Sequence, residues 1–188
     1  MSSFTEPSSG PTAGTGRTLD EVMGLAMAVG NPDPPCWDNT NRYVDCGNGT
    51  VHDTVTNLIW LKNANCYGQF DYAAANNAAA GLEDGECGLT DGSSPGDWHL
   101  PTREEWAATV ERAVALGCTS PVLTNTPGTG CYSARPQPFT GVQSNYYWSS
   151  TPGASPTSYA WYVYLNGGDV YYYGKTGTIY VWPVRGGQ

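Results

Sequence analysis

The sequence has little charge, and positive charge is especially scarce. Lys and Arg together number 8 against 17 Asp and Glu among 188 residues, which gives a formal net charge of -9 and a pI near 4.4. A protein that binds duplex nucleic acid needs basic side chains to neutralise phosphates, so we expect no nucleic-acid partner. The same shortage disfavours sulfated or anionic polysaccharides as ligands.

Long apolar runs and a secretory leader are also missing. No stretch reaches the roughly 18 apolar residues of a membrane-spanning helix, so we expect no membrane span. The chain opens on the polar residues 1–6, and we expect that a leader or anchor is missing from it. None of the six cysteines forms a Cys-x-x-Cys pair, which favours disulfides and an extracellular or surface location over a metal site.

Residues 1–35 differ in composition from the rest. Residues 1–17 are rich in Ser, Gly, Thr and Pro, which predicts a flexible tail. Thr18 and Glu21 have capping-box spacing, and apolar positions on one face predict a short amphipathic helix over 18–29, followed by a Pro-rich linker. Such a short helix is marginal alone, so it would dock on the domain or drive homo-oligomerisation.

Residues 36–188 predict an α+β, loop-rich domain. Gly47-Asn48-Gly49 between two β-patterned stretches indicates a hairpin, and 58–61 is typical of a buried strand. An Ala-rich stretch over 72–80 predicts one helix. A second capping box at Thr102 and Glu105, with a stripe from Trp106 to Val114, predicts another. The strand candidates of the last third are 146–150, 159–165, 170–174 and 178–185.

Six cysteines allow fifteen pairings. Nearest-neighbour pairing closes three short loops, each contributing about 2–4 kcal/mol, and we expect it. The three bonds would be Cys36–Cys46, Cys66–Cys87 and Cys118–Cys131.

Groups suited to catalysis are few, and we expect no enzyme. His52 and Asp53 are interpreted as a polar surface pair in a hairpin, and His99 as a structural hydrogen-bonding group. A cysteine nucleophile would compete with the disulfides. The acidic stretch Glu83-Asp84-Gly85-Glu86 could take a hard cation such as calcium, but a solvated loop is its ordinary interpretation, so we expect no metal and no cofactor.

Several motifs, taken in order, resemble a known family. They are Gly47-Asn48-Gly49-Thr50-Val51, Leu58-Ile59-Trp60-Leu61, Gly96-Asp97-Trp98-His99-Leu100-Pro101-Thr102, Tyr147-Trp148-Ser149-Ser150-Thr151 and Val184-Arg185-Gly186-Gly187. This pattern is similar to the DUF1566 domains of the Legionella collagen-like C-terminal type. The resemblance implies a C-type-lectin-like fold over 36–188, with two helices packed on small antiparallel sheets.

The chain's end, residues 180–188, resembles more narrowly the variable proteins of diversity-generating retroelements. In these systems a template-directed hypermutator rewrites adenines, which implies a variable segment over about 145–188. Asparagine codons in a template would yield Tyr, Asp, Ser, Thr or Gly, the types seen at 162, 164, 167, 169, 171–174 and 177–178. One adenine change also turns an AGG arginine codon into a tryptophan codon, which adds Trp182 to these positions.

The same segment has the composition of a binding surface. Nine of the 13 Tyr lie after residue 140, among Ser, Gly, Thr and Asn, as in antibody loops. Strand alternation predicts that Tyr162 and Tyr164 face outward together with Tyr171 and Tyr173, while Tyr172 lies on the other face or in a bend. Trp161, with Val163 and Leu165, is the better core set.

The leading hypothesis is therefore a secreted or surface-displayed binding protein whose ligand is a protein or other surface component of another cell or particle. One alternative is a carbohydrate-binding adhesin whose aromatic side chains stack on sugar rings. Another is a structural module that oligomerises through its N-terminal helix. The predicted ligand-binding residues are Tyr159, Tyr162, Tyr164, Gly167, Asp169, Tyr171, Tyr172, Tyr173, Gly174, Gly177, Thr178 and Trp182. The predicted rigid frame is Trp60, Trp98, Leu100, Trp106, Trp148, Trp161 and Val184.

Overall fold

The fold is described from a computed structural model, which covers residues 36–155 and 157–186. The predicted tail, the helix over 18–29 and the linker to residue 35 lie outside the described residues. Within the described ranges, no helix is both long and apolar enough to cross a membrane.

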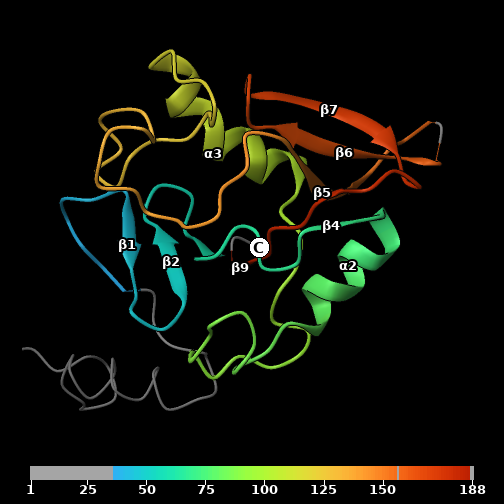
Figure 1. Ribbon diagram of the computed structural model, residues 1–188, viewed down its shortest axis with the longest axis horizontal. Coiled ribbons are helices and arrows are strands. Elements are labelled where there is room, and N and C mark those ends of the chain that lie inside the picture. The colour runs from blue at the N-terminus through green and yellow to red at the C-terminus, as the bar shows by residue number, and fades with distance from the viewer. Residues whose placement is uncertain (1–35, 156, 187–188) are drawn as a thin grey trace, which may run out of the picture. The chain divides into compact units, whose positions relative to one another are not determined.

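The described residues form two helices and two small sheets, which is the α+β, C-type-lectin-like arrangement that the resemblance implies (Figure 1). One sheet has the strand order β1-β2-β3-β9 and the other the order β4-β8-β5-β6-β7. In chain order the elements are β1 (Tyr43–Asp45), β2 (Thr50–Asp53), β3 (Leu58–Leu61), β4 (Gln69–Phe70), α2 (Tyr72–Gly81), α3 (Arg103–Ala115), β5 (Tyr146–Pro152), β6 (Tyr159–Tyr164), β7 (Asp169–Gly174), β8 (Ile179–Tyr180) and β9 (Val184–Gly186).

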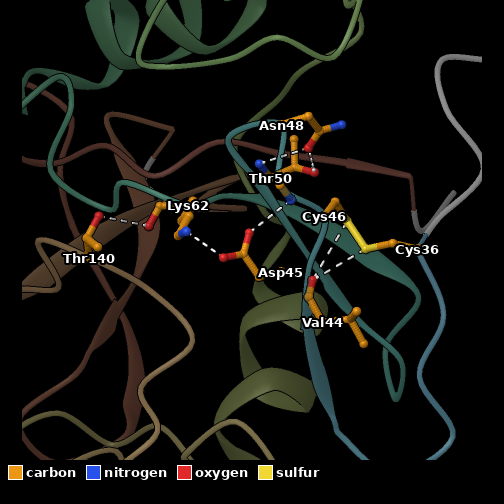
Figure 2. Close-up of polar contacts among 9 residues, drawn as sticks. Cys36, Val44, Asp45, Cys46, Asn48, Thr50, Lys62 and Thr140 are labelled. Atoms are coloured by element: carbon orange, nitrogen blue, oxygen red, sulfur yellow. Dashed lines mark hydrogen bonds and ion pairs between the residues drawn. A yellow bond between two sulfur atoms is a disulfide. The ribbon is translucent and has the colours of Figure 1, made fainter.

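The β1–β2 hairpin forms where Gly47-Asn48-Gly49 predicts it. Gly49 adopts φ +85°, and a Cβ there would lie 2.3 Å from the Gly88 carbonyl oxygen, so the close approach requires glycine. The Asn48 side-chain oxygen accepts from both the backbone N–H and the hydroxyl of Thr50, at 3.2 and 2.7 Å (Figure 2). Beside this turn Lys62 Nζ donates to Asp45 at 2.5 Å, which ties the hairpin to the end of β3 (Figure 2).

The helices begin at polar caps. The Thr102 hydroxyl accepts from the Glu105 N–H while the Glu105 carboxylate accepts from the Thr102 N–H, so the predicted capping box of α3 is present. Trp106, Val110 and Ala113 turn inward from α3, but Val114 is exposed, so its place in the predicted apolar stripe is wrong. The α2 cap is Asp71, which accepts from the Ala74 N–H at 2.9 Å.

The predicted strand over 178–185 is two strands in different sheets. β8 lies parallel to β5 in the second sheet, with Tyr180 opposite Tyr147, whereas β9 pairs antiparallel with β3 in the first. Pro183 lies between them and has no N–H to donate to a ladder, so the chain leaves one sheet before it and enters the other after it. This crossing joins the two sheets through the core.

Three disulfides staple the loops. They join Cys36 to Cys46, Cys66 to Cys87 and Cys118 to Cys131, which is the pairing that closes the shortest loops. Figure 2 shows the first, with both sulfur atoms beside the Val44 carbonyl oxygen. All six cysteines are therefore oxidised, and none remains as a free thiol.

Tryptophans occupy the centre of the core. The five that are almost fully shielded from solvent are Trp60, Trp98, Trp106, Trp148 and Trp182. Leu100 and Val184 are also buried, so the predicted frame is correct except at Trp161, which is only partly buried. The packing of large rigid rings gives the sheets a fixed platform.

Two charged groups near β1 are buried as a pair. Arg42 donates to both carboxylate oxygens of Asp53, at 3.1 and 2.8 Å, and to the Thr109 carbonyl oxygen of α3 at 3.0 Å. His52 is also buried, with its ring nitrogens 3.0 Å from the Cys36 carbonyl oxygen and 3.1 Å from the Asn57 side-chain oxygen. The interpretation of His52 and Asp53 as a surface pair is wrong, because β2 is covered on both faces.

Candidate ligand-binding surface

Cross-strand register places five tyrosines on one face of the second sheet. Tyr164 lies opposite Tyr146 of β5, and Tyr162 lies opposite Tyr171 of β7. Tyr173, two residues beyond Tyr171, belongs to the same face because side chains alternate along a strand. We call this set, Tyr146, Tyr162, Tyr164, Tyr171 and Tyr173, the tyrosine face.

The rings of the tyrosine face contact one another by stacking and edge-on packing and are at least partly open to solvent. Tyr146 stacks on Tyr164 with 4.5 Å between ring centroids and meets Tyr162 edge-on at 5.0 Å. Tyr173 lies edge-on to Tyr162 at 6.4 Å. Tyr146, Tyr171 and Tyr173 are 38%, 54% and 50% exposed, and Tyr162 and Tyr164 are half-buried between them. An exposed aromatic patch of this kind is typical of an interaction site.

A pocket of about 460 Å³ opens in this face. Tyr146, Tyr162 and Tyr173 form its aromatic wall, and Ile179 of β8 adds an apolar contact. Its other lining residues, Gln69, Asn145 and Thr178, are polar and uncharged. The pocket therefore offers apolar ring surface together with neutral hydrogen-bonding groups, the usual composition of a site for a small ligand or an inserted side chain.

Charge around the pocket is low. Asp169 lies opposite Tyr164 at the start of β7, and the Lys175 ammonium lies over the Tyr72 ring, 5.1 Å from its centroid. Partial burial raises the pKa of Tyr162, and the neighbouring Tyr146 and Asp169 raise it further. The phenol is therefore neutral at physiological pH and can donate or accept a hydrogen bond.

Three predicted residues lie on the other face of the sheet. Tyr172 is opposite Trp161, as alternation predicts, and its ring is 5.7 Å from the rings of both Trp161 and Tyr159. The Arg103 guanidinium covers Trp161 at 4.9 Å. The prediction that Tyr159 and Tyr172 share one patch with Tyr162 is thus wrong. Tyr159 is three residues from Tyr162 along β6, and Tyr172 is next to Tyr171, the residue opposite Tyr162, so alternation puts both on the other face of the sheet.

The predicted loop positions lie at the ends of β7. Gly167 and Gly168 both direct their N–H groups to the Tyr164 carbonyl oxygen, at 3.2 and 2.7 Å, which closes the tight turn before Asp169. At the other end Gly177 lies under the Tyr173 ring, and a Cβ there would be 2.1 Å from Tyr173 Cε1. Gly174 is half-buried, and Thr178 is exposed.

Trp182 is not a surface residue, and its prediction as a ligand contact is wrong. It is 1% exposed, and its ring lies 4.8 Å from those of both Trp60 and Phe139. Its Nε1 donates to the Leu61 carbonyl oxygen at 2.7 Å. The segment between β8 and β9 crosses the core, so the side chain at 182 has no route to solvent.

Four pocket residues, Gln69, Asn145, Tyr146 and Ile179, are not among the residues predicted from the sequence. Tyr146 is absent from the predicted binding residues, although alternation along β5 turns it to the opposite face from the buried Tyr147. Gln69 and Asn145 reach the pocket because β4 and β5 flank β8 in the sheet. That neighbourhood depends on the strand order, which no local signal in the sequence reveals.

Fold and surface together define a disulfide-stabilised α+β domain that presents aromatic and neutral polar groups on one sheet face. Comparison with known families agrees: the model of the Lcl C-terminal domain matches residues 49–185, and the chain belongs to this family. No curated protein matches the sequence. Family and surface indicate a surface or ligand-binding module of the adhesin type, and the disulfides indicate an extracellular or surface location.

Proposed function

We propose that the tyrosine face binds a protein or other surface ligand on another cell or particle, and that a diversity-generating retroelement varies its side chains. The observation that carries the proposal is a face of five at least partly accessible tyrosines, three of which line one pocket, on strands held by a buried tryptophan core. Tyrosine supplies a large contact area for little side-chain entropy, which suits recognition by a rigid sheet.

Burial supports the diversification part of the proposal. Ten of the eleven positions predicted to vary are at least partly accessible to solvent, and the eleventh, Trp182, is buried in the core. The ten accessible positions are 162, 164, 167, 169, 171–174 and 177–178. Val163, Ile179 and Val181, which lie between or next to them, are buried. Variation confined to accessible positions would change the ligand without disturbing the core.

Binding is tested with labelled full chain on an array of extracellular protein domains and an array of glycans. We expect a protein signal that Tyr162→Ala and Tyr173→Ala each reduce by about 2 kcal/mol of binding free energy. Tyr159→Ala, a half-buried tyrosine on the opposite face, is the matched control and should leave the signal unchanged. Equal loss in all three variants would reject the tyrosine face as the site.

Diversification is tested in the encoding DNA. We expect a nearby near-copy of the codons for 145–188 that differs from them almost only at adenines. A complete genome without such a copy would remove the retroelement from the proposal and leave the binding surface as it stands.

A sugar is the second candidate ligand, and the pocket is the observation that favours it. Tyr146, Tyr162 and Tyr173 offer ring faces, and Gln69, Asn145 and Thr178 offer neutral amide and hydroxyl groups beside them. Binding on the glycan array that Tyr162→Ala abolishes, without a protein signal, would select this candidate. Light scattering before and after deletion of residues 1–35 addresses the third interpretation, a structural module that oligomerises through its N-terminal segment.

A further inference from the structure

The outer edge of β7 is an unpaired strand edge within the described part of the chain. β7 pairs with β6 along its whole length, and no other described strand lies on its far side (Figure 1). It has six residues, whereas β4 at the opposite end of the sheet has two. No proline or bulge interrupts 170–174, and the charged residues Asp169 and Lys175 stand only at the two ends of this stretch. The Tyr171 and Tyr172 rings stack on each other at 4.5 Å beside this edge and must separate for another strand to pair there.

The hydrogen bonds of β6 determine which β7 groups face outward. Leu165 N–H donates to the Asn145 carbonyl oxygen at 3.0 Å, and Gly153 N–H donates to the Tyr159 carbonyl oxygen at 2.8 Å. The odd-numbered residues of β6 therefore form their backbone hydrogen bonds with β5. The even-numbered residues form their backbone hydrogen bonds with β7, because the N–H and C=O groups of successive residues point to opposite sides of a strand.

The backbone groups of β7 alternate in the same way. Lys175 N–H donates to the Ser158 carbonyl oxygen at 2.8 Å, so the odd-numbered residues of β7 bond to β6. Val170, Tyr172 and Gly174 consequently direct their N–H and C=O groups to the outer edge. Of these groups the Gly174 carbonyl accepts from the Gly177 N–H at 2.9 Å.

We propose that this edge pairs antiparallel with β7 of a second copy of the chain, in a register centred on Tyr172. Tyr172 then exchanges two backbone bonds with Tyr172 of the second copy, and each Gly174 N–H donates to the Val170 carbonyl oxygen across the pair. Only registers that set even-numbered residues opposite even-numbered ones satisfy the outward groups.

Charge selects this register among the allowed ones. Asp169 and Lys175 are the charged residues that flank the edge, and centring on Tyr172 sets each Asp169 opposite Lys175 of the second copy, twice by symmetry. Both side chains lie on the tyrosine face. Asp169 is opposite Tyr164, and Lys175 lies over Tyr72, whose ring packs on Trp148. In the dimer the Lys175 ammonium leaves the Tyr72 ring to reach Asp169 of the second copy. The remaining even-to-even registers lose this pairing.

The dimer has a functional consequence that does not depend on the identity of the ligand. The two tyrosine faces become neighbours on one continuous sheet face, with Tyr171 of each copy opposite Tyr173 of the other. A ligand that repeats on a cell surface could then engage both faces at once, which raises its apparent affinity without any new contact.

Sedimentation equilibrium of the full chain over a concentration series tests the pairing. We expect reversible dimers that Asp169→Lys and Lys175→Asp each weaken about tenfold and that the double exchange, Asp169→Lys with Lys175→Asp, restores. A chain that stays monomeric, or a double exchange as weak as the single ones, would overturn the proposal. Neither result bears on the tyrosine face, which the binding arrays test separately.

A backbone variant tests the edge directly. Tyr172→Pro removes an outward N–H without removing a bond to β6 and should abolish the dimer, whereas Tyr172→Val keeps the N–H and should preserve it. Near-UV circular dichroism checks that the proline variant folds, and if it does not, the charge exchange decides. Association that survives Tyr172→Pro but disappears on deletion of residues 1–35 would assign self-association to the N-terminal segment instead.

Discussion

Trp182→Ala should be among the most destabilising substitutions in the domain. The indole is almost fully buried, lies 4.8 Å from two aromatic rings and donates to the Leu61 carbonyl oxygen at 2.7 Å. Truncation of a core tryptophan to alanine costs about 3–5 kcal/mol, and the carbonyl left without its donor adds about 1 kcal/mol. We therefore expect the free energy of unfolding to fall by about 4 kcal/mol or more.

Urea denaturation followed by far-UV circular dichroism, with the disulfides intact, measures this loss. Trp37→Ala is the matched control, because Trp37 is 66% exposed and meets His52 edge-on at 5.1 Å. In Trp37→Ala the free energy of unfolding should fall by less than about 1 kcal/mol. Equal, small losses at 37 and 182 would mean that Trp182 is a surface residue, and the account of the core would be refuted.

Three further predictions concern pH, the pocket and the buried ion pair. Burial lowers the pKa of His99, so the unfolded chain binds more protons and stability should fall as the pH drops below about 6.5; an unchanged pH profile in His99→Gln would contradict this. Gly177→Ala should displace the Tyr173 ring from the pocket and weaken ligand binding with little loss of stability, since that ring is half exposed; wild-type affinity would contradict it. Arg42→Met leaves Asp53 buried without its partner and should cost about 3–5 kcal/mol in urea denaturation, whereas a loss below about 1 kcal/mol would show that Asp53 can reach solvent.

Local signals in the sequence were sufficient for the elements that form locally. The capping box at Thr102 and Glu105 predicts the start of α3, and the Gly-rich turn before Thr50 predicts the first hairpin. Two-residue alternation in β6 and β7 correctly places Tyr162 opposite Tyr171 and Tyr172 opposite Trp161, but it does not predict that the adjacent Tyr171 and Tyr172 rings stack at 4.5 Å. Each of these signals depends on neighbours within a few positions, which the sequence displays directly.

Features that depend on distant partners could not be predicted in the same way. Trp182 follows a tyrosine-rich, largely accessible segment in the sequence, and only the passage of the chain from β8 to β9 buries it. Asp53 is hydrophilic by type, but Arg42 compensates its charge inside the protein. The pocket joins Gln69 to Tyr146 through the strand order of the second sheet, and strand order is a property of the whole fold.

Hydroxyl-radical footprinting of the full chain, with and without the ligand that the arrays select, tests most directly where recognition occurs. Mass spectrometry reports the oxidation of each tyrosine. We expect the ligand to protect Tyr146, Tyr162 and Tyr173, and to leave Tyr159 on the opposite face as reactive as before. Protection of Tyr159 with unchanged reactivity at the other three would place the ligand elsewhere and contradict the account.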